Sequence, residues 1–262
     1  MTTVRTPAVA GMFYPNNPRQ LHDQIQGYLA ETKAAGPAPK AIIAPHAGYI
    51  YSGPVAASAY ARLQAARNII HRVVLLGPSH RVGFKGIAIS GMDTFATPLG
   101  NIPVDQDTVA QLRDLPSVVF LEEAHVREHS LEVHLPFLQE VLGDFKLVPL
   151  VIGDATPEQV GTVLEALWGG PETLIVISSD LSHYYDYQTA KQLDIATSQA
   201  IESLRFENIG YENACGRNPI NGLLWVARRK GLRGETIDLR NSGDTAGPRD
   251  QVVGYGAYAF ND

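Results

Sequence analysis

Short apolar runs alternate with longer segments of helical pattern along most of this chain, and that alternation restricts the fold more than any other feature of the sequence. The runs are bounded by Gly, Pro or Asn, and they cover residues 41–44, 73–76, 87–89, 147–152, 174–177, 236–239 and 252–259. Apolar runs that are this short and this continuous are typical of strands buried on both faces of a sheet. They therefore predict a buried β-sheet.

The segments between these runs carry the signals of helices. Apolar residues at helical spacing predict helices at 55–66, 131–142, 157–168, 188–204 and 219–229. Thr156 is placed to cap the third of these helices, and Pro136 should break or kink the second because proline lacks a backbone N–H. Residues 94–104, with Pro and Gly, are expected to form a hairpin or a loop excursion.

Strands that alternate with helices predict an α/β fold with a mainly parallel or mixed central sheet and helices on both faces. A chain of 262 residues with 45% hydrophobic residues is long enough for one large core, and no linker divides it. We therefore expect a single domain over residues 1–262.

The charge and cysteine content exclude several classes of partner. The net charge of −6 is spread along the chain without a basic stripe, which argues against nucleic acid. The chain has one cysteine, no signal-peptide pattern at its start and no apolar run near the ~20 residues that span a bilayer. We expect a cytoplasmic protein with no membrane partner; its apolar helices permit a homodimer without marking an interface.

Polar residues follow four of the predicted strands at their C-terminal ends. They are His46, His80, the pair Asp180 and His183, and the group Asn241, Asp244 and Thr245. In an open parallel sheet, ligands bind in the crevice outside the carboxyl ends of the strands. A single histidine beside a strand is usually a satisfied surface or core residue, but three of them at strand ends indicate a site. Two neutral imidazoles with a carboxylate suit Fe(II), and the same set can hold zinc with an activated water.

A second histidine-rich segment reads H-V-R-E-H-S-L-E-V-H-L-P and contains His125, Glu128, His129, Glu132 and His134. The spacing of four residues between its first two histidines is a weak zinc signal, and the stronger H-E-x-x-H pattern is absent. The alternative interpretation is a solvated, capped helix start.

The only cysteine, Cys215, stands at the expected start of a helix. That position can lower the pKa of a thiol. We favour the other interpretation, a small buried residue, because free cysteines are usually buried.

Several motifs together resemble the Memo family, known in prokaryotes as AmmeMemoRadiSam system protein B. They are A-G-M-F-Y-P at 10–15, A-P-H-A-G-Y-I-Y-S-G at 44–53, L-G-P-S-H at 76–80, E-H-S-L-E-V-H-L-P-F-L at 128–138, S-S-D-L-S-H-Y at 178–184 and C-G-R-N-P-I at 215–220. The resemblance runs from residue 10 to the last strand. It implies a fold similar to that of class III extradiol non-haem iron dioxygenases. It also implies pathway partners that are AMMECR1-like and radical SAM proteins.

The resemblance further implies roles for individual residues. The histidines that match His46 and His80 bind metal in the family, and the residues that match Asp180 and His183 lie beside them. The residue that matches His183 corresponds to the acid/base histidine of the dioxygenases. The segment E-H-S resembles their D-H-G segment, which implies that His129 also faces the site.

The third metal ligand is where this chain departs from the resemblance. Animal members carry a ligand cysteine that we align with the segment N-S-G-D-T, where this chain has Thr245 and no cysteine. We expect Asp244 to join His46 and His80 as a carboxylate ligand, with Fe(II) as the metal. Copper and zinc are alternatives, and so is a site without metal.

Three functions remain open on these residues. The first is a metal-dependent redox enzyme, similar to a dioxygenase, that acts on an unknown small molecule. In it His183, oriented by Asp180, moves protons, and His129 contacts the substrate. The second is a zinc-type metallohydrolase that uses the same residues. The third is a peptide- or protein-binding module on a degenerate dioxygenase fold.

Overall fold

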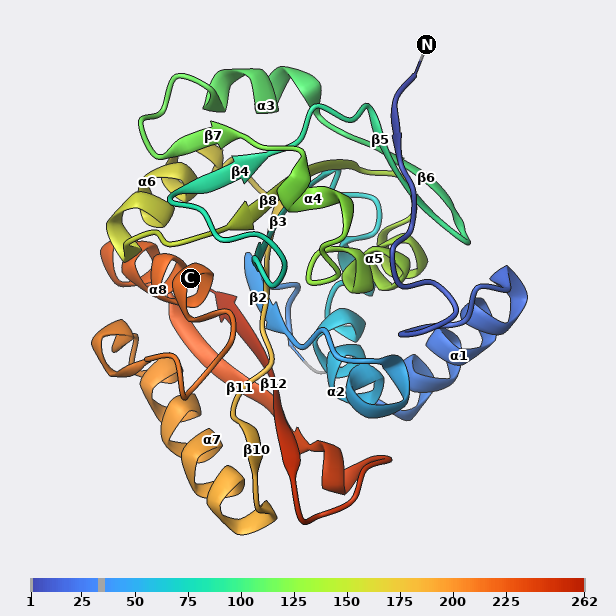
Figure 1. Cartoon of the computed structure of the whole chain (residues 1–262), viewed down its shortest axis with the longest axis vertical. Helices are drawn as coiled ribbons and strands as arrows, with labels where there is room; N and C mark the ends of the chain where they lie inside the picture. The colour runs from blue at the N-terminus through green and yellow to red at the C-terminus, as the bar shows by residue number, and fades with distance from the viewer. Residues whose placement is uncertain (1, 33–35, 262) are drawn as a thin grey trace.

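A mixed β-sheet forms the centre of the molecule, and the computed structural model describes it together with the rest of residues 2–32 and 36–261 (Figure 1). The strands run in the order β10, β12, β2, β9, β3, β8, β4 and β7, and β11 also pairs with β12. Their bounds are β10 His183–Tyr185, β12 Val252–Asn261, β2 Ala41–Ala44, β9 Thr173–Ser178, β3 Arg72–Pro78, β8 Lys146–Ile152, β4 Ile87–Ile89, β7 Val118–Phe120 and β11 Arg233–Asn241. This arrangement confirms the predicted α/β fold with a mixed sheet.

The four inner strands β2, β9, β3 and β8 are parallel, and they are buried almost throughout. The outer strands β12 and β4 run antiparallel to β2 and β8, respectively. Because the inner strands are parallel, their carboxyl ends meet at one edge of the sheet, where a crevice is expected.

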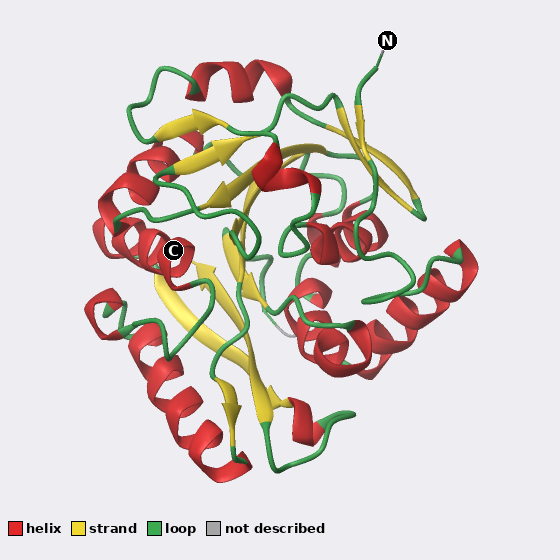
Figure 2. Cartoon of the chain, in the orientation of Figure 1, coloured by secondary structure: helices red, strands yellow, loops and turns green. Residues whose placement is uncertain are grey.

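Helices cover both faces of this sheet (Figures 1 and 2). The helices are α1 Pro18–Glu31, α2 Tyr49–Ala61, α3 Gln106–Leu112, α4 Glu123–Val126, α5 Leu135–Leu142, α6 Pro157–Leu167, α7 Tyr187–Glu202 and α8 Arg217–Lys230. Helices α6 and α8 pack together, and α8 contacts β3 and β9. Helices α1, α2 and α5 group on the opposite side, where α2 contacts β2 and β12. Helix α7 packs against β11, β12 and β10.

The predicted effect of Pro136 is confirmed. The segment Glu132–His134 is a short 3-10 turn, and α5 begins only at Leu135, with Pro136 in its first turn. A proline is tolerated there because the first N–H groups of a helix have no intrahelical partner. The helix therefore begins four residues later than the predicted start at residue 131.

Two helices differ from their predictions at the N-terminal side. Helix α1 was not predicted, although Asn17 caps it and Pro18 begins it. Helix α2 begins at Tyr49, six residues before its predicted start, and contains Pro54. The Tyr49 N–H donates to the Phe13 carbonyl at 2.7 Å. That long-range contact satisfies one of the free donors at the helix start.

A small second sheet and an exposed apolar area lie away from the inner strands. The predicted hairpin at 94–104 is confirmed as β5 Thr94–Thr97 and β6 Gly100–Pro103, and β1 Val4–Arg5 joins it.

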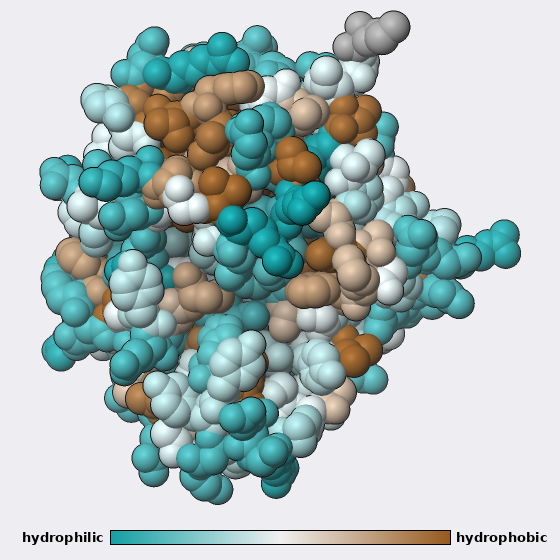
Figure 3. Space-filling model, in the orientation of Figure 1, coloured by the Kyte–Doolittle hydropathy of each residue, from teal (hydrophilic) through white to brown (hydrophobic). Residues whose placement is uncertain are grey.

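Figure 3 shows apolar surface over the region of β4 and β7, where Val119 and Phe120 are exposed. Within residues 2–32 and 36–261, no helix is both long and apolar enough to cross a membrane.

Candidate metal centre

A pocket of about 550 Å³ opens at the carboxyl ends of β2, β3 and β9. Its lining residues are Phe13, His46, Ala47, Gly48, His80, His129, Asp180, His183, Tyr184, Tyr211, Cys215 and Val253. A larger hollow of about 640 Å³ lies at the opposite edge of the sheet, but its buried carboxylate Asp105 is already paired with Arg72 at 2.9 Å. The histidines therefore make the smaller pocket the better candidate for chemistry.

His46 is held in one tautomer by a serine beneath it. Its Nδ1 lies 2.6 Å from Ser178 Oγ, and the Ser178 hydroxyl donates its only proton to the Ser130 carbonyl at 2.6 Å. The Ser178 oxygen must therefore accept a proton from His46 Nδ1. Burial, together with the neighbouring histidines, lowers the pKa of His46 well below its usual value. The ring is neutral, and its free lone pair is on Nε2.

A buried glutamate orients His80 in the same way, through a hydrogen bond to its Nδ1 atom. Its Nδ1 lies 2.9 Å from Glu128 Oε1, and its backbone N–H donates to Glu128 Oε2 at 2.6 Å. Burial alone would raise the pKa of Glu128, but the hydrogen bonds and the charge of His80 lower it to about 2. An ionised carboxylate can only accept, so Nδ1 of His80 carries a proton, and Nε2 is the ring nitrogen left to bind a metal. A carboxylate behind a ligand histidine is a common arrangement at metal sites.

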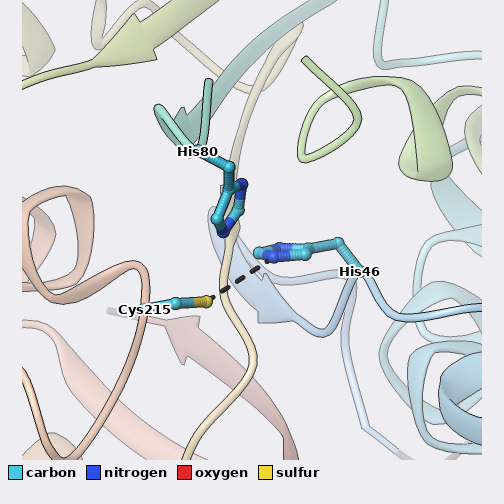
Figure 4. Close-up of side chains that lie close together, drawn as sticks. All are labelled: His46, His80 and Cys215. Carbon is cyan, nitrogen blue, oxygen red and sulfur yellow. Dashed lines mark hydrogen bonds between the residues drawn. The ribbon is translucent and has the colours of Figure 1, made fainter. Parts of the chain in front are cut away.

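Cys215 completes the cluster from the turn that precedes α8 (Figure 4). Its Sγ lies 3.5 Å from His46 Nε2, and ligand atoms of His46, His80 and Cys215 all lie within 4.8 Å of one another. The turn is fixed because the Gly216 N–H donates to Ser179 Oγ at 2.9 Å. Burial and the nearby Asp180 raise the pKa of the Cys215 thiol to about 12. A cation is therefore needed to displace the thiol proton at neutral pH.

A second group of ligand atoms, from His80, Glu128 and His129, also lies close together. Glu128 Oε1 is already occupied, because it accepts from His80 Nδ1 and from the backbone N–H groups of His129 and Ser130 at 2.9–3.0 Å. This group therefore serves better to orient His80 than to hold a second ion. The His129 ring stacks on His80 with 4.7 Å between ring centroids, and burial lowers the pKa of His129 to about 4.

Asp180 and His183 both line the pocket, but the expected orientation of His183 by Asp180 does not involve a hydrogen bond between the two side chains. Asp180 Oδ1 accepts from the His46 backbone N–H at 2.8 Å, and burial raises the pKa of Asp180. His183 Nδ1 instead lies 2.8 Å from the Leu181 carbonyl oxygen. That carbonyl can only accept, so Nδ1 carries a proton, and Nε2 of His183 is the ring nitrogen that remains to exchange a proton with a bound molecule.

The residue after His183 has an unusual backbone conformation. Tyr184 has a φ of 63°, in the left-handed region, and the pairing of β10 with β12 is irregular between His183 and Tyr185. Such a conformation costs a non-glycine residue about 1 kcal/mol or more, and strained residues of this kind often cluster at active sites. It leaves Tyr184 70% exposed at the mouth of the pocket.

The expectation that Asp244 joins His46 and His80 was wrong. Strand β12 pairs with both β2 and β11. Its Tyr258 pairs with Ile43, so the end of β2 lies level with Ala257 of β12. Ala257 in turn pairs with Asp238 of β11. Strand β11 therefore continues three residues beyond that level, about 10 Å at the usual rise per residue. Asp244 lies past its end, where it accepts from the Tyr187 hydroxyl at 2.6 Å.

Cys215, and not Asp244, lies close to His46 and His80, so Cys215 is more than the small buried residue that was expected. The C-G-R-N-P-I motif carries no local signal for these two histidines, which are 169 and 135 residues away in the chain. Glu128 and Ser178, which orient the two histidines, were not assigned that role either.

Three other members of the histidine-rich segment, His125, Glu132 and His134, lie outside the pocket. His125 Nε2 lies 3.0 Å from the Ala88 carbonyl, and His134 Nδ1 lies 2.6 Å from the Tyr60 hydroxyl. Glu132 is fully buried and accepts from Arg5, from two backbone N–H groups of the N-terminal segment and from the Tyr14 hydroxyl. It anchors the segment that carries Phe13 to the pocket wall, where Phe13 meets His129.

The ligand atoms fit a transition metal. Two imidazole Nε2 atoms, on rings whose Nδ1 is already hydrogen-bonded, and one thiol form a set that suits zinc, copper or iron better than Mg²⁺ or Ca²⁺. Because the cluster faces an open pocket, it would leave positions on a metal free for water or substrate, as catalytic sites do.

Comparison with known proteins supports the resemblance. The family model described as Memo-like protein matches residues 5–259. A MEMO1 family protein of Saccharolobus solfataricus is 36% identical and covers 98% of this chain and 99% of its own length. A MEMO1 family protein of Aquifex aeolicus is 37% identical, with coverage of 96% and 97%.

A solved structure shows the same fold at low identity. The crystal structure of an uncharacterized protein from Escherichia coli K12 is 13% identical, has a TM-score of 0.51 and covers 84% of this chain and 98% of its own.

Proposed function

This chain belongs to the Memo-like protein family, and on that premise we propose that it is a metal-dependent redox enzyme for a small-molecule substrate. One divalent or monovalent transition-metal ion would be held by His46 Nε2, His80 Nε2 and Cys215 Sγ. The observation that carries this proposal is the convergence of these three atoms within 4.8 Å, with both imidazoles fixed in the tautomer that frees Nε2.

A bound metal would supply Lewis acidity and, if it is iron or copper, a change of oxidation state. The chain's own residues have separable tasks. His183 Nε2 is free to take a proton from a substrate in the pocket, because its Nδ1 proton is committed to the Leu181 carbonyl. His129 and Phe13 form one wall, and their edge-to-face contact fixes the position of the His129 ring.

The thiol alters the choice of metal. The Fe(II) set expected from the sequence had two histidines and a carboxylate, whereas the set proposed here has the thiol of Cys215, which lies close to both histidines, as its third ligand. Sulfur ligands favour copper and zinc more than a carboxylate does. The same geometry therefore also supports a second function, a zinc-type hydrolase in which His183 activates a water.

The test is metal analysis of protein that is purified anaerobically and offered Fe(II), Cu(I) or Zn(II) separately. We expect near-stoichiometric binding of at least one metal by the native chain, and its loss in the double variant His46→Ala/His80→Ala. The matched control is His22→Ala/His71→Ala, which removes two exposed histidines outside the pocket.

The two functions are then distinguished by whether turnover requires oxygen. Oxygen uptake by the iron or copper form with a screened substrate supports the redox enzyme, and oxygen-independent turnover by the zinc form supports the hydrolase. Unchanged stoichiometry in the His46→Ala/His80→Ala variant would refute the metal centre. Absence of binding in the native chain would do so as well, and a partner-binding role would then take its place.

A further inference from the structure

One peptide group lies between a buried carboxylate and the proposed proton-moving histidine. The Leu181 carbonyl oxygen accepts from His183 Nδ1 at 2.8 Å, and the Ser182 N–H donates to Asp194 Oδ1 at 3.0 Å. The C=O of residue 181 and the N–H of residue 182 are the two ends of the same peptide bond. The carboxylate of Asp194, this peptide and the His183 ring therefore form one continuous hydrogen-bonded chain.

Strand β12 holds the same peptide segment from the other side. The Leu181 N–H donates to the Gly254 carbonyl and the Gly254 N–H donates to the Ser182 carbonyl, both at 2.8 Å. A side chain at position 254 would overlap the carboxylate of Asp194. The glycine at this position therefore leaves room for the carboxylate of Asp194. The two backbone hydrogen bonds to it leave the Leu181–Ser182 segment little freedom to move.

The carboxylate and the peptide in this chain of hydrogen bonds are shielded from water, whereas the His183 ring is partly exposed. Leu181 and Ser182 are fully buried, and Asp194, which α7 contributes, is 2% exposed. In such a low-dielectric setting, hydrogen bonds in series polarise one another more strongly than in water.

Several other ionisable groups surround Asp194. They are His183 on β10, Tyr258 on β12, Arg240 on β11, Asp244 after β11, and Tyr187 and Lys191 on α7. Burial raises the pKa of Asp194 to about 6, against the opposing effects of its Ser182 hydrogen bond and of His183. Its charge therefore changes within an accessible pH range.

We propose that Asp194 is a positioning residue for His183 and acts on it through the Leu181–Ser182 peptide. A negative Asp194 polarises this peptide, makes the Leu181 oxygen a stronger acceptor and keeps the proton on His183 Nδ1. When Nε2 takes a proton from substrate, the ring becomes positive and the same polarised carbonyl stabilises it. The proposal rests on the proposed function only in its claim that His183 moves protons.

The test follows the His183 ring by NMR in protein with ¹⁵N-labelled histidine, without metal or substrate. Its signals are assigned by their loss in His183→Ala. In the native chain we expect them to move in two pH steps, one from protonation of the ring itself and one at the pH where Asp194 ionises. Asp194→Asn keeps an oxygen that can accept from Ser182 and removes only the charge, so the second step should vanish.

Asp250→Asn is the matched control, because it removes one negative charge from an exposed loop, and it should retain both steps. The backbone amide signal of Ser182 provides a measurement on the native chain alone, and it should shift at the pH of the second His183 step. Superimposable His183 titrations of the native chain and Asp194→Asn would overturn the proposal and leave Asp194 as an anchor of the loop. So would a Ser182 amide signal that does not shift at that pH.

Metal binding by the native chain and by Asp194→Asn distinguishes a failure of this proposal from a failure of the proposed metal centre. Asp194→Asn should bind metal with native stoichiometry, because Asp194 contacts none of the three ligand residues. Failure of the native chain to bind metal would refute the metal centre while the two-step titration of His183 stands. A single-step native titration with normal metal binding would refute only the relay through the peptide.

Discussion

The Nδ1 atom of His80 lies 2.9 Å from Oε1 of Glu128, and the same carboxylate also accepts the His80 backbone N–H. Glu128 thus fixes both the ring and the backbone of a residue that is partly open to solvent. The proposed metal centre depends on this buried acid as much as on its three ligand atoms.

Glu128→Gln should weaken metal binding at the centre without removing any ligand. Loss of a carboxylate behind a metal-binding histidine typically reduces metal affinity by about 10- to 100-fold. Competition titration with a chelator measures the affinity, and Glu123→Gln, in the exposed first turn of α4, is the control. Equal affinities in the two variants would show that His80 does not need Glu128.

Cys215→Ser should remove the sulfur ligand and leave the fold intact. Loaded with Co(II), the native chain should show a charge-transfer absorption from thiolate to metal, which the variant should lack. Asp244→Ala should keep that absorption, because Asp244 is bound to Tyr187 and lies outside the pocket. A Cys215→Ser variant that retains the band would exclude Cys215 as a ligand, and loss of the band in Asp244→Ala would restore the carboxylate ligand that the sequence predicted.

Glu132→Gln should destabilise the protein strongly. The change leaves the buried Arg5 without its ionised partner and weakens the contacts to the N-terminal segment. Breaking a buried ion pair on one side costs about 3–5 kcal/mol. Urea unfolding at pH 7 measures the loss, with Glu140→Gln as a control because its ion-pair partner, His22, is about half exposed. A loss below about 1 kcal/mol would mean that the buried pair does not anchor this segment.

Acid should destabilise the fold partly through His134. Burial lowers the pKa of His134 to about 3, below the 6.5 expected for the unfolded chain. Between these two pKa values the unfolded state binds more protons, so stability is complete above about pH 6.5 and falls as the pH decreases. From pH 7 to pH 5 the loss from this one residue is about 2 kcal/mol.

The free energy of unfolding of His134→Gln should differ less between pH 7 and pH 5 than that of the native chain does. Urea unfolding at the two values tests this. His71→Gln, an exposed histidine, should keep the native difference. A pH dependence in His134→Gln equal to that of the native chain would show that His134 is not held neutral by the fold.

Local patterns in the sequence were sufficient for most of the fold. Short, continuous apolar runs predicted the buried strands. A strand that is covered on both faces carries apolar residues at successive positions, because neither face meets water. Thr156 predicted the start of α6, where the structure has a full capping box. Helix α1 escaped prediction although Asn17 and Pro18 signal its start, because its apolar face, with Leu21, Ile25 and Leu29, was not taken into account.

The sequence by itself also determined the family and the edge of the sheet at which His46, His80, Asp180 and His183 meet. That edge follows from strand direction, because helical crossovers between the strands make neighbouring strands parallel and bring their carboxyl ends to one edge. The tertiary structure alone decided which third group joins the histidines. Asp244 follows a strand that runs past the site, whereas the turn before α8 brings in Cys215 from far along the chain. Register and packing between distant segments set such contacts, and a local pattern contains no information about either.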